Sequence, residues 1–411
     1  MGKTRVVVAM SGGVDSSVAA ALLVQQGYDV IGIMLRLWAE DGNDAHGQPN
    51  TNRCCAPEAV VDARAIARQL GIPFYDIHAE AIFKQRVVEP WINGYAEATT
   101  PNPCFNCNRS IRFGFLMQRA LALGAEYLAT GHYARVSGPQ TADGGSQEIA
   151  GGPPSAVSGP DSQIPARYRL LKGHDPKKDQ SYVLHVLGQR DLARAMFPCG
   201  GYVKDEVRAL AREFGLPTAE RPESQDLCFL TQGDYRGFLK RNAPDIAIPG
   251  PIVTSRGEVI GQHEGLPYYT VGQRKGLQIH ATSSSAEPWY VLRLDAARNA
   301  VVAGPLRELG ASSVRVGAMH YCADAPPASD VRASARIRYK AKEAEGWLRP
   351  LPGGGARFDF DEPQRDATPG QGLVVYSGDE VIGGGVIVRG TAAASLGSLA
   401  CRSESDIRSS C

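Results

Sequence analysis

The sequence has no run of 18 or more apolar residues, which is the length that a membrane-spanning helix requires, so no membrane span is predicted. It also has almost no excess charge, because 44 lysines and arginines stand against 43 aspartates and glutamates, for a net charge of +1. The overall charge therefore gives no argument for nucleic-acid binding, and any such site has to be a local patch. No secretory signal precedes the first apolar segment, and we expect a cytoplasmic protein.

The chain contains nine cysteines, an odd number, and lacks the secretory signal that would accompany a disulfide framework. We therefore expect most of them to be reduced, catalytic or metal-binding. Cys401 and Cys411 lie in a tail, residues 393–411, that is low in apolar residues and is expected to be disordered, so neither is assigned a role.

The first 135 residues alternate between strand-like and helix-like segments, which predicts an open parallel α/β sheet with its ligand at the carboxyl ends of the strands. From about Pro249 onward, short strand-like runs are separated by glycine turns, a pattern typical of a small barrel or sandwich. The stretch 137–166 is rich in Gly, Ser and Pro and is interpreted as a flexible insertion between the strands "YARV" and "RYRLLKG". We expect an α/β domain over 1–215 with the insertion 137–166, a small central domain over 216–285, a C-terminal β-barrel over 286–392, and the tail 393–411.

The segment "AMSGGVDSS" follows the first strand and precedes a helix rich in alanine and leucine. Gly12 and Gly13 allow a close backbone approach, and the amides of the helix start favour an anion, so this turn predicts a phosphate site. Asp15 is unusual at a pure anion site and suggests a bridging Mg²⁺. A helix capped by Asp15 or Ser16 without any ligand is the alternative.

The string lacks the lysine of a G-x-x-x-x-G-K-[ST] loop and the spacing of G-x-G-x-x-G. It resembles the SGGxDS loop of ATP-pyrophosphatase enzymes, which adenylylate their substrates and release pyrophosphate. That resemblance implies ATP and a class of chemistry, and it does not identify the acceptor.

Two further segments carry cysteines in positions typical of reactive thiols. Cys104 and Cys107 form a C-x-x-C just before a helix, with Arg109 and Arg112 nearby, and Cys228 follows a proline-marked turn in "RPESQDLCFL". A structural zinc site would need a second pair at short spacing, and the sequence has none. A redox pair, a reactive thiol and a three-cysteine Fe–S site remain open.

Six blocks occur in an order that resembles the tRNA-specific 2-thiouridylase family: "SGGVDSS", "TPNPCFNCNRSIRFG", "ATGHYAR", "KKDQSYVLHVL", "RPESQDLCF" and "GQHEGLPYYTVGQRKGL". The match runs from Val6 to about Arg389, apart from the insertion. The resemblance implies an ATP-pyrophosphatase domain, a central domain and a C-terminal β-barrel. It also implies adenylylation of the 2-carbonyl of the wobble uridine of tRNA, followed by transfer of persulfide sulfur from a cysteine desulfurase or a sulfur-relay protein.

The resemblance assigns roles residue by residue. Cys228 matches the cysteine that carries the persulfide and Cys107 the nucleophile and resolving partner, which implies a disulfide bond in the cycle. Many relatives have aspartate at the position of Cys104, so this chain is of a C-x-x-C variety in which a third thiol is either spare or a ligand of a [4Fe-4S] cluster with Cys107 and Cys228. The remaining matches are Ala9, Met10, Ser11, Gly12, Gly13, Val14, Asp15, Ser16, Leu35 and Gly131 for ATP, and Asn102, Pro103, Cys104, Lys178, Asp179, Gln180, Arg338 and Tyr339 for tRNA.

Several of these residues have ordinary structural interpretations. Leu35 taken alone favours core packing, and Arg338 and Tyr339 fit an exposed strand face as well as phosphate contact and stacking. Other functions for the chain are an amide-forming adenylylating enzyme, a regulator that only senses ATP, and a sulfur-carrier or Fe–S scaffold. Two thiols far apart in sequence favour sulfur transfer over amide formation.

Overall fold

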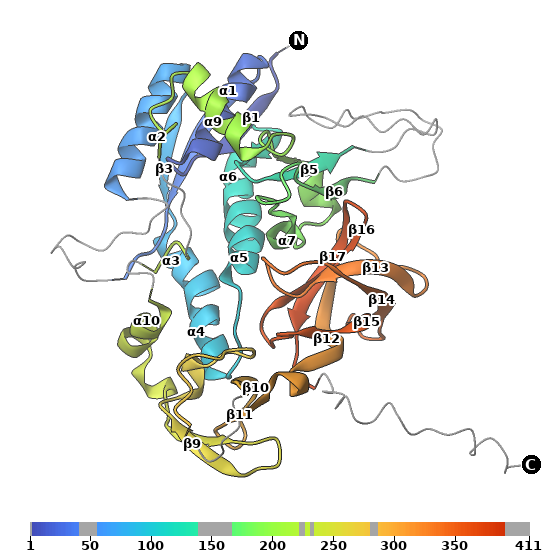
Figure 1. Ribbon diagram of the computed structural model, residues 1–411. Coiled ribbons are helices and arrows are strands. Elements are labelled where there is room, and N and C mark those ends of the chain that lie inside the picture. Colours follow the sequence, from blue (N-terminus) through green and yellow to red (C-terminus); the bar gives the residue numbers. More distant parts are fainter. Residues whose placement is uncertain are drawn as a thin grey trace, which may run out of the picture.

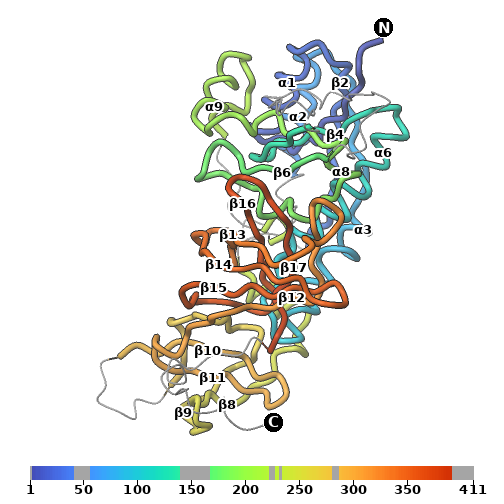
Figure 2. Tube along the Cα trace, turned by 90° about the vertical axis from the view of Figure 1, so that its right-hand side faces the viewer, coloured from blue at the N-terminus to red at the C-terminus, as the bar shows by residue number. Residues whose placement is uncertain are grey.

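The computed structural model describes residues 2–40, 56–138, 167–221, 227–230, 234–279 and 287–390. The N-terminal α/β region lies at one end of an elongated molecule, segment 234–305 lies at the other, and the last strands lie between them (Figures 1 and 2). The predicted tail and almost all of the predicted insertion lie outside the described residues.

The N-terminal region is built on a five-stranded parallel sheet of order β3-β2-β1-β4-β7. Val6, Val7 and Val8 in the central strand are fully buried, as the valine run predicts for a strand covered on both faces. The carboxyl ends of β1 and β4 lie side by side, since Val8 pairs with Ala129. The strands are β1 (Arg5–Ala9), β2 (Asp29–Arg36), β3 (Phe74–His78), β4 (Tyr127–Ala129) and β7 (Ala195–Met196).

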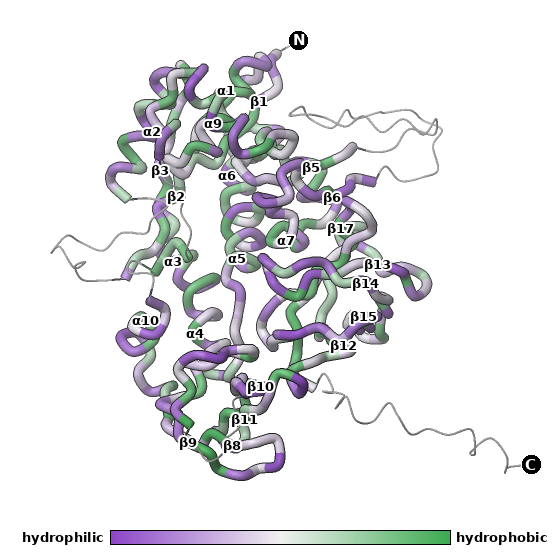
Figure 3. Tube along the Cα trace, in the orientation of Figure 1, coloured by the Kyte–Doolittle hydropathy of each residue, from purple (hydrophilic) through white to green (hydrophobic). Residues whose placement is uncertain are grey.

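Helices cover this sheet. The alanine- and leucine-rich α1 is buried along most of its length, whereas α2 alternates hydrophilic and hydrophobic residues and buries one face (Figure 3). Residues 80–96 are helical, which the sequence pattern did not predict. The helices of this region are α1 (Val14–Gln25), α2 (Pro57–Leu70), α3 (Glu80–Phe83), η1 (Lys84–Val88), α4 (Glu89–Ala96), α5 (Pro103–Asn106), η2 (Cys107–Leu116), α6 (Met117–Ala122), α7 (Ser181–Leu184), α8 (Gln189–Leu192) and α9 (Lys204–Glu213).

The central region contains α10 (Tyr235–Asn242), the short helical turns Pro244–Ile246 and Leu266–Tyr268, and a four-stranded sheet of order β10-β11-β8-β9. This sheet continues to Pro305, beyond the boundary at residue 285 that the sequence analysis expected. Glycine-punctuated strands look alike in this sheet and in the barrel, so their pattern does not reveal which sheet they join. The strands are β8 (Gly250–Val253), β9 (Val259–His263), β10 (Trp289–Asp295) and β11 (Ala300–Pro305).

The C-terminal strands form an antiparallel sheet of order β12-β15-β14-β13-β16-β17, which closes because β12 also pairs with β17. Together with the parallel sheet, this closed barrel confirms the predicted fold class. The strands are β12 (Gly310–Tyr321), β13 (Val331–Arg336), β14 (Ala344–Pro350), β15 (Ala356–Arg365), β16 (Gly372–Ser377) and β17 (Glu380–Ile387), with a short turn, Leu306–Glu308, before them.

The segment "AEYLATGHYARV" contributes to two different sheets. β4 ends at Ala129, and β5 (Ala134–Ser137) forms a hairpin with β6 (Arg169–Lys172) that joins the barrel where Leu171 pairs with Glu380 of β17. Thr130–Tyr133 connect the two sheets. Residues of this turn also contact the phosphate loop, as described below.

We expect that deleting residues 139–166 and bridging the ends with a short Gly-Ser turn changes stability little. Ser137 pairs with Arg169 at the end of the β5–β6 hairpin, so a short connection spans the gap. Shortening a loop changes its closure entropy by about 1 kcal/mol or less. Thermal unfolding of the deletion variant checks this, and a fall of more than ten degrees or so in the midpoint would contradict it, because about 1 kcal/mol shifts Tm by a few degrees.

Candidate functional site

The phosphate loop, Ser11–Gly13, connects β1 to α1 at the carboxyl edge of the parallel sheet. Gly12 has φ of +66°, and a Cβ added there would lie 2.4 Å from the carbonyl oxygen of Ala59. Only glycine fits this position. Gly13 is the N-cap of α1, and no described side chain caps it, so the helix start presents backbone amides in the way that an anion site requires.

The serine side chains divide between the loop and the helix. The Ser16 hydroxyl accepts a hydrogen bond from the Ser11 amide at 3.1 Å and lies 3.2 Å from the Ser11 hydroxyl. Ser17 is fully buried and donates to the Gly13 carbonyl at 2.8 Å. Ser11 and Ser16 therefore line the loop, and Ser16 also donates to the Gly13 carbonyl at 3.1 Å, whereas Ser17 only stabilises the first turn of α1.

Asp15 is the centre of a charged cluster, of which Asp15 was predicted from the sequence and Lys204 was not. Its Oδ1 accepts hydrogen bonds from Lys204 Nζ at 2.6 Å and from the Tyr133 hydroxyl at 2.7 Å. The Lys204 side chain is only 8% exposed, and its amide donates to Asp175 Oδ2 at 3.0 Å. A buried ammonium is thus aimed at the phosphate loop from the first residue of α9.

Lys204 was missed, although the sequence carries a signal for it. A lysine in the first turn of a helix opposes the helix dipole, which favours acidic residues there. Lys204 opens "KDEVRALARE" in spite of that cost, because its side chain leaves the helix to pair with Asp15.

Gly131, predicted to lie on the adenine side, packs directly against the phosphate loop. A Cβ at this position would lie 2.6 Å from the Ser16 amide nitrogen and 2.7 Å from the Asp15 carbonyl carbon. Leu35, near the end of β2, is partly buried against two hydrophobic clusters, so packing accounts for it without a ligand. Adenine contacts by these two residues stay a prediction.

His132, next to Gly131, is buried and held on both ring nitrogens. Nδ1 lies 2.7 Å from the Thr130 hydroxyl, and Nε2 lies 2.9 Å from Nη1 of Arg112. Because a guanidinium can only donate, Nε2 is the acceptor and the ring is neutral. Burial and the neighbouring Arg112 charge hold the pKa of His132 well below its usual range.

His185 is also buried and neutral, and the two histidines make stability depend on pH. Burial lowers the pKa of His185 to about 3, whereas an unfolded histidine titrates near 6.5. Below about pH 6.5 this histidine is protonated in the unfolded chain but stays neutral in the folded chain. The free energy of unfolding therefore falls as the pH is lowered. Between pH 7.5 and 5.5, each such histidine contributes a loss of about 1.4 kcal/mol. Urea unfolding of the parent chain and of His185→Asn at both pH values checks this, since the variant should lose about 1.4 kcal/mol less.

Cys104 and Cys107 lie at the start of a continuous helical stretch. Pro103 opens α5, and Oδ1 of the N-cap residue Asn102 accepts a hydrogen bond from the Cys104 amide at 3.0 Å. Cys107 begins η2, a wide π-type segment of the kind often found at functional sites. The residues predicted to meet the target base thus form one helix start.

The three cysteines predicted to handle sulfur, Cys104, Cys107 and Cys228, are free thiols and partly buried. Cys107 and Cys228 pack against the same hydrophobic cluster, which includes Phe229 and Leu230, although they are far apart in sequence. Cys104 instead packs against a different cluster, with Phe105 and Tyr182. Cys107 and Cys228, the pair predicted to exchange sulfur, thus pack against one cluster, and Cys104, three positions before Cys107, packs against another.

This arrangement does not fit the [4Fe-4S] cluster that was left open. Among the described residues no group of three His, Cys, Asp or Glu side chains is placed to hold a metal ion, and Cys104 turns to a different core from the other two thiols. Two more cysteines, Cys199 and Cys322, are fully buried, and burial raises the pKa of both thiols, which makes them unreactive.

The segment Lys178–Gln180, predicted to touch tRNA, is largely occupied within the protein. Asp179 is buried and accepts hydrogen bonds from the Gly173 and Ser181 amides and from Arg336 at 2.7 Å. The Gln180 side chain accepts from the Tyr133 amide. The Asp179 and Gln180 side chains brace the turn at the phosphate loop, and the prediction of RNA contact rests on Lys178 and on the backbone.

Arg338 and Tyr339 differ in their surroundings. Arg338 is largely buried and donates from Nη2 to the Val271 carbonyl at 2.8 Å and to the Thr368 hydroxyl, so it joins the central region to the barrel. Tyr339 is 36% exposed, and its ring lies 5.9 Å from that of Tyr182. A stacking role fits Tyr339 better than a phosphate contact fits Arg338.

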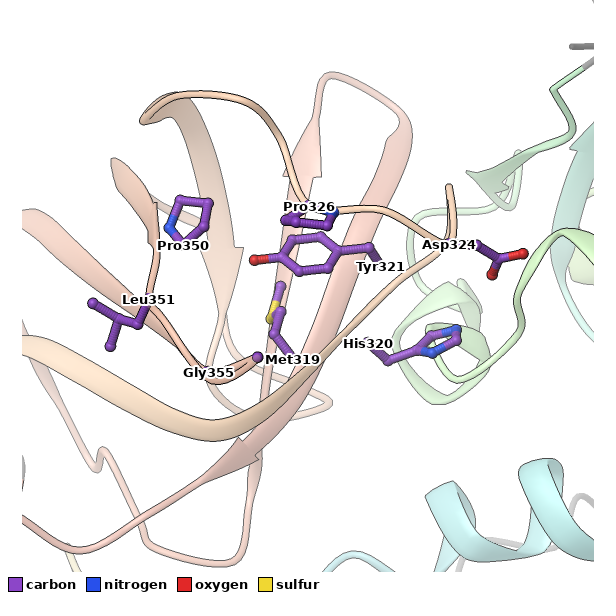
Figure 4. Close-up of a pocket in the computed structure, with 9 residues that line it drawn as sticks. Met319, His320, Tyr321, Asp324, Pro326, Pro350, Leu351 and Gly355 are labelled. Atoms are coloured by element: carbon purple, nitrogen blue, oxygen red, sulfur yellow. The ribbon is translucent and has the colours of Figure 1, made fainter.

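One cavity lies apart from this site. It has a volume of about 360 Å³ at the side of the barrel and is lined by β12 and neighbouring turns, with Met319, Tyr321, Pro326, Pro350 and Leu351 among its walls (Figure 4). None of the residues predicted to bind ATP or carry sulfur belongs to it. No helix in the described part of the chain is long and apolar enough to cross a membrane.

Comparison with known proteins places the chain in a family. Residues 4–232 match a family described as "tRNA methyl transferase HUP domain", 236–305 a PRC-barrel domain of the same name, and 311–387 an "Aminomethyltransferase beta-barrel domain". A solved 4-thiouridine synthetase–RNA complex with bound ATP covers 59% of this chain and 51% of its own at 15% identity, with a TM-score of 0.31, which is too low to inform the site.

The curated relatives are more similar to this chain in sequence than the solved structure is. The tRNA-specific 2-thiouridylase MnmA of Moorella thermoacetica is 45% identical over 92% of this chain and 98% of its own length. The protein of the same name from Symbiobacterium thermophilum is 44% identical over 94% and 92%, and that from Roseiflexus sp. is 45% identical over 94% and 99%. The chain belongs to the tRNA-specific 2-thiouridylase family.

Proposed function

We propose that the protein is a tRNA-uridine 2-sulfurtransferase, which uses ATP and a persulfide to convert the wobble uridine of tRNA to 2-thiouridine. The observation that carries the proposal is the combination of one phosphate loop with two distant cysteines, Cys107 and Cys228, on one hydrophobic cluster. Family membership supports it, since the relatives carry this activity in their names.

The first step activates the uridine. The 2-carbonyl oxygen attacks the α-phosphorus of ATP, pyrophosphate leaves, and the oxygen becomes part of a good leaving group. Ser11, Ser16 and the amides at the start of α1 are placed to bind the departing phosphates, and Lys204 supplies a buried positive charge beside them. Asp15 is a carboxylate of the type that would hold Mg²⁺ with phosphate oxygens, and bound Mg²⁺ would offset the charge of pyrophosphate.

The second step transfers sulfur. The terminal sulfur of a persulfide on Cys228 attacks C2, and AMP leaves with the former carbonyl oxygen. The Cys107 thiolate then attacks Sγ of Cys228, so a Cys107–Cys228 disulfide forms and the sulfur stays on C2 as the thiocarbonyl. A cellular thiol reduces the disulfide, and a cysteine desulfurase or sulfur-relay protein reloads Cys228.

The family description and the names of the relatives point to different reactions, methyl transfer and thiolation. Methyl transfer has no use for a phosphate loop that releases pyrophosphate or for paired thiols. The site residues therefore favour thiolation. An amide-forming enzyme would likewise leave Cys107 and Cys228 without a role.

A turnover assay tests the proposal. The full chain is incubated with ATP, Mg²⁺, unmodified tRNA, a cysteine desulfurase and cysteine, and the digested nucleosides are measured by mass spectrometry. We expect 2-thiouridine with release of AMP and pyrophosphate. Methylated uridine, or pyrophosphate release that does not depend on tRNA, would overturn the proposal.

A further inference from the structure

Lys204 and Tyr133, which both donate to Asp15 Oδ1, are each held by one segment of the chain. This segment is the β6–α7 turn, residues 173–180, between strand β6 and helix α7. Lys204 Nζ lies 2.6 Å from Asp15 Oδ1, and the Lys204 amide donates to Asp175 Oδ2 in the turn at 3.0 Å. Asp175 therefore fixes the backbone from which the ammonium reaches the phosphate loop.

Asp175 is buried, and both of its carboxylate oxygens accept hydrogen bonds from backbone amides. Oδ1 accepts from the Lys177 amide at 2.9 Å, while Oδ2 accepts from the Lys204 amide. Although burial works in the opposite direction, hydrogen bonds from these amides and from the Lys178 amide lower the pKa of Asp175. The side chain is thus a carboxylate at neutral pH, and its negative charge stabilises the start of α9 through the helix dipole.

Tyr133 is held by the same turn through its backbone. The Gln180 side chain accepts from the Tyr133 amide at 2.9 Å, and the Gln180 amide donates to the Tyr133 carbonyl at 2.8 Å. The Tyr133 ring is buried, and its hydroxyl donates to Asp15 Oδ1 at 2.7 Å. A buried ring on a backbone fixed at both its amide and its carbonyl has little freedom, so the turn also sets the direction of this hydroxyl.

The barrel also holds the β6–α7 turn. Arg336 of β13 donates to Asp179 Oδ2 at 2.7 Å and to Glu343 Oε1 at 2.9 Å, and only 14% of the Arg336 side chain is exposed. Asp179 is buried and also accepts from the Gly173 and Ser181 amides, each at 3.0 Å. Because salt screens a buried ion pair far less than an exposed one, this contact anchors the turn to the barrel.

We infer that the β6–α7 turn is a positioning element for the phosphate loop: Asp175 places the Lys204 ammonium against Asp15, and Arg336 anchors the turn to the barrel. Asp175 acts on Asp15 through Lys204, and Arg336 acts through Asp179. The inference rests on the proposed function, because the property that these residues control is the rate of pyrophosphate release at the phosphate loop.

A double-mutant cycle between Asp175 and Lys204 tests the inference. Pyrophosphate release with ATP, Mg²⁺ and unmodified tRNA is measured for the full chain, for Asp175→Asn, for Lys204→Met and for the double variant. We expect Asp175→Asn to lower kcat by about tenfold, as is typical when a residue that orients a functional side chain is lost, and to change the KM for ATP much less. In the Lys204→Met background, the same substitution should have almost no further effect, because the group that Asp175 positions is absent.

Asp205→Asn is the matched control for Asp175→Asn. Asp205 is an exposed carboxylate in the first turn of α9, one position after Lys204. The substitution removes the same charge from the helix start and leaves the carboxylate that holds the Lys204 amide, so kcat should stay close to that of the parent.

Arg336→Gln tests the anchor from the side of the barrel. We expect it to lower kcat by about fivefold, the lower end of coupling between distant sites, and Arg336→Lys to lower it less. Arg332→Gln is the control on the same strand, because it breaks an exposed ion pair with Asp361, and it should leave kcat unchanged.

Thermal unfolding identifies any variant that fails to fold, and if Asp175→Asn is one of them, the Arg336 and Arg332 variants decide. Losses that add in the Asp175–Lys204 cycle, or a folded Arg336→Gln chain with the parent kcat, would overturn the inference. A parent chain that releases no pyrophosphate in the presence of tRNA would overturn the proposed function instead.

Discussion

Replacing Cys228 by serine should abolish 2-thiouridine formation while tRNA-dependent pyrophosphate release continues. A serine hydroxyl cannot carry a persulfide, and it is not ionised at physiological pH as a thiolate is. Activation of the uridine uses the phosphate loop and the bound base, and the structure keeps Cys228 in a hydrophobic cluster that involves no phosphate-loop residue. The two steps should therefore separate. Pyrophosphate release and nucleoside analysis measured on the same samples check this.

Cys107→Ser should give the same separation, because the resolving thiol is needed only after activation. Cys322→Ser is the matched control: this cysteine is buried in another part of the molecule, and burial raises the pKa of its thiol to about 12, so thiolation should survive. A Cys228→Ser chain that still thiolates tRNA would contradict the assignment of the sulfur carrier.

Cys104→Ser distinguishes the remaining roles of the third thiol. Since Cys104 packs against a different hydrophobic cluster from Cys107 and Cys228, we expect thiolation to persist in this variant. If thiolation is lost together with iron from anaerobically purified protein, Cys104 is a cluster ligand.

The fold was predictable wherever a local sequence pattern is compatible with only one kind of secondary structure. Val6–Val8 followed by two glycines and an alanine-rich helix predicts a buried parallel strand, a glycine turn and a helix, and the structure has all three. The glycine-punctuated strands after Pro249 predicted a small barrel or sandwich, and the resemblance to the family implied the closed barrel that the structure shows. The pattern does not predict which strands pair with each other. β10–β11 and the barrel strands have similar glycine-punctuated sequences but belong to different sheets.

The site was less predictable because its charges come from distant segments. Lys204 contacts Asp15, 189 positions earlier in the sequence, and Arg221 contacts Gly12, 209 positions earlier. Neither residue lies in the segment "AMSGGVDSS" from which the loop was predicted. Conversely, Asp179 was predicted to contact tRNA, yet tertiary packing buries it beside Arg336. The sequence gives the type of each residue. Whether that residue is buried or ion-paired depends on which helices and strands pack against it in the folded protein.

Asp15 has two possible roles at the phosphate loop, and they predict different behaviour. It positions the Lys204 ammonium through the 2.6 Å contact, and it offers a carboxylate for Mg²⁺. With a neutral residue in place of Asp15, the Lys204 ammonium would lose its charged partner and its fixed position. A neutral isostere therefore removes the anionic ligand and loosens Lys204 without leaving a cavity.

Asp15→Asn should consequently lower tRNA-dependent pyrophosphate release by about 10²-fold or more, the size of effect seen when one preorganised electrostatic group is removed. Tyr133→Phe is the matched control, because it removes one hydrogen bond to the same oxygen and leaves the ion pair, so its loss should be far smaller. Measuring the rate against Mg²⁺ concentration separates the roles: a Mg²⁺ ligand makes Asp15→Asn require more Mg²⁺, whereas a purely positioning role lowers the rate at every concentration, as Lys204→Met then should. A folded Asp15→Asn chain that releases pyrophosphate at the parent rate would contradict both roles.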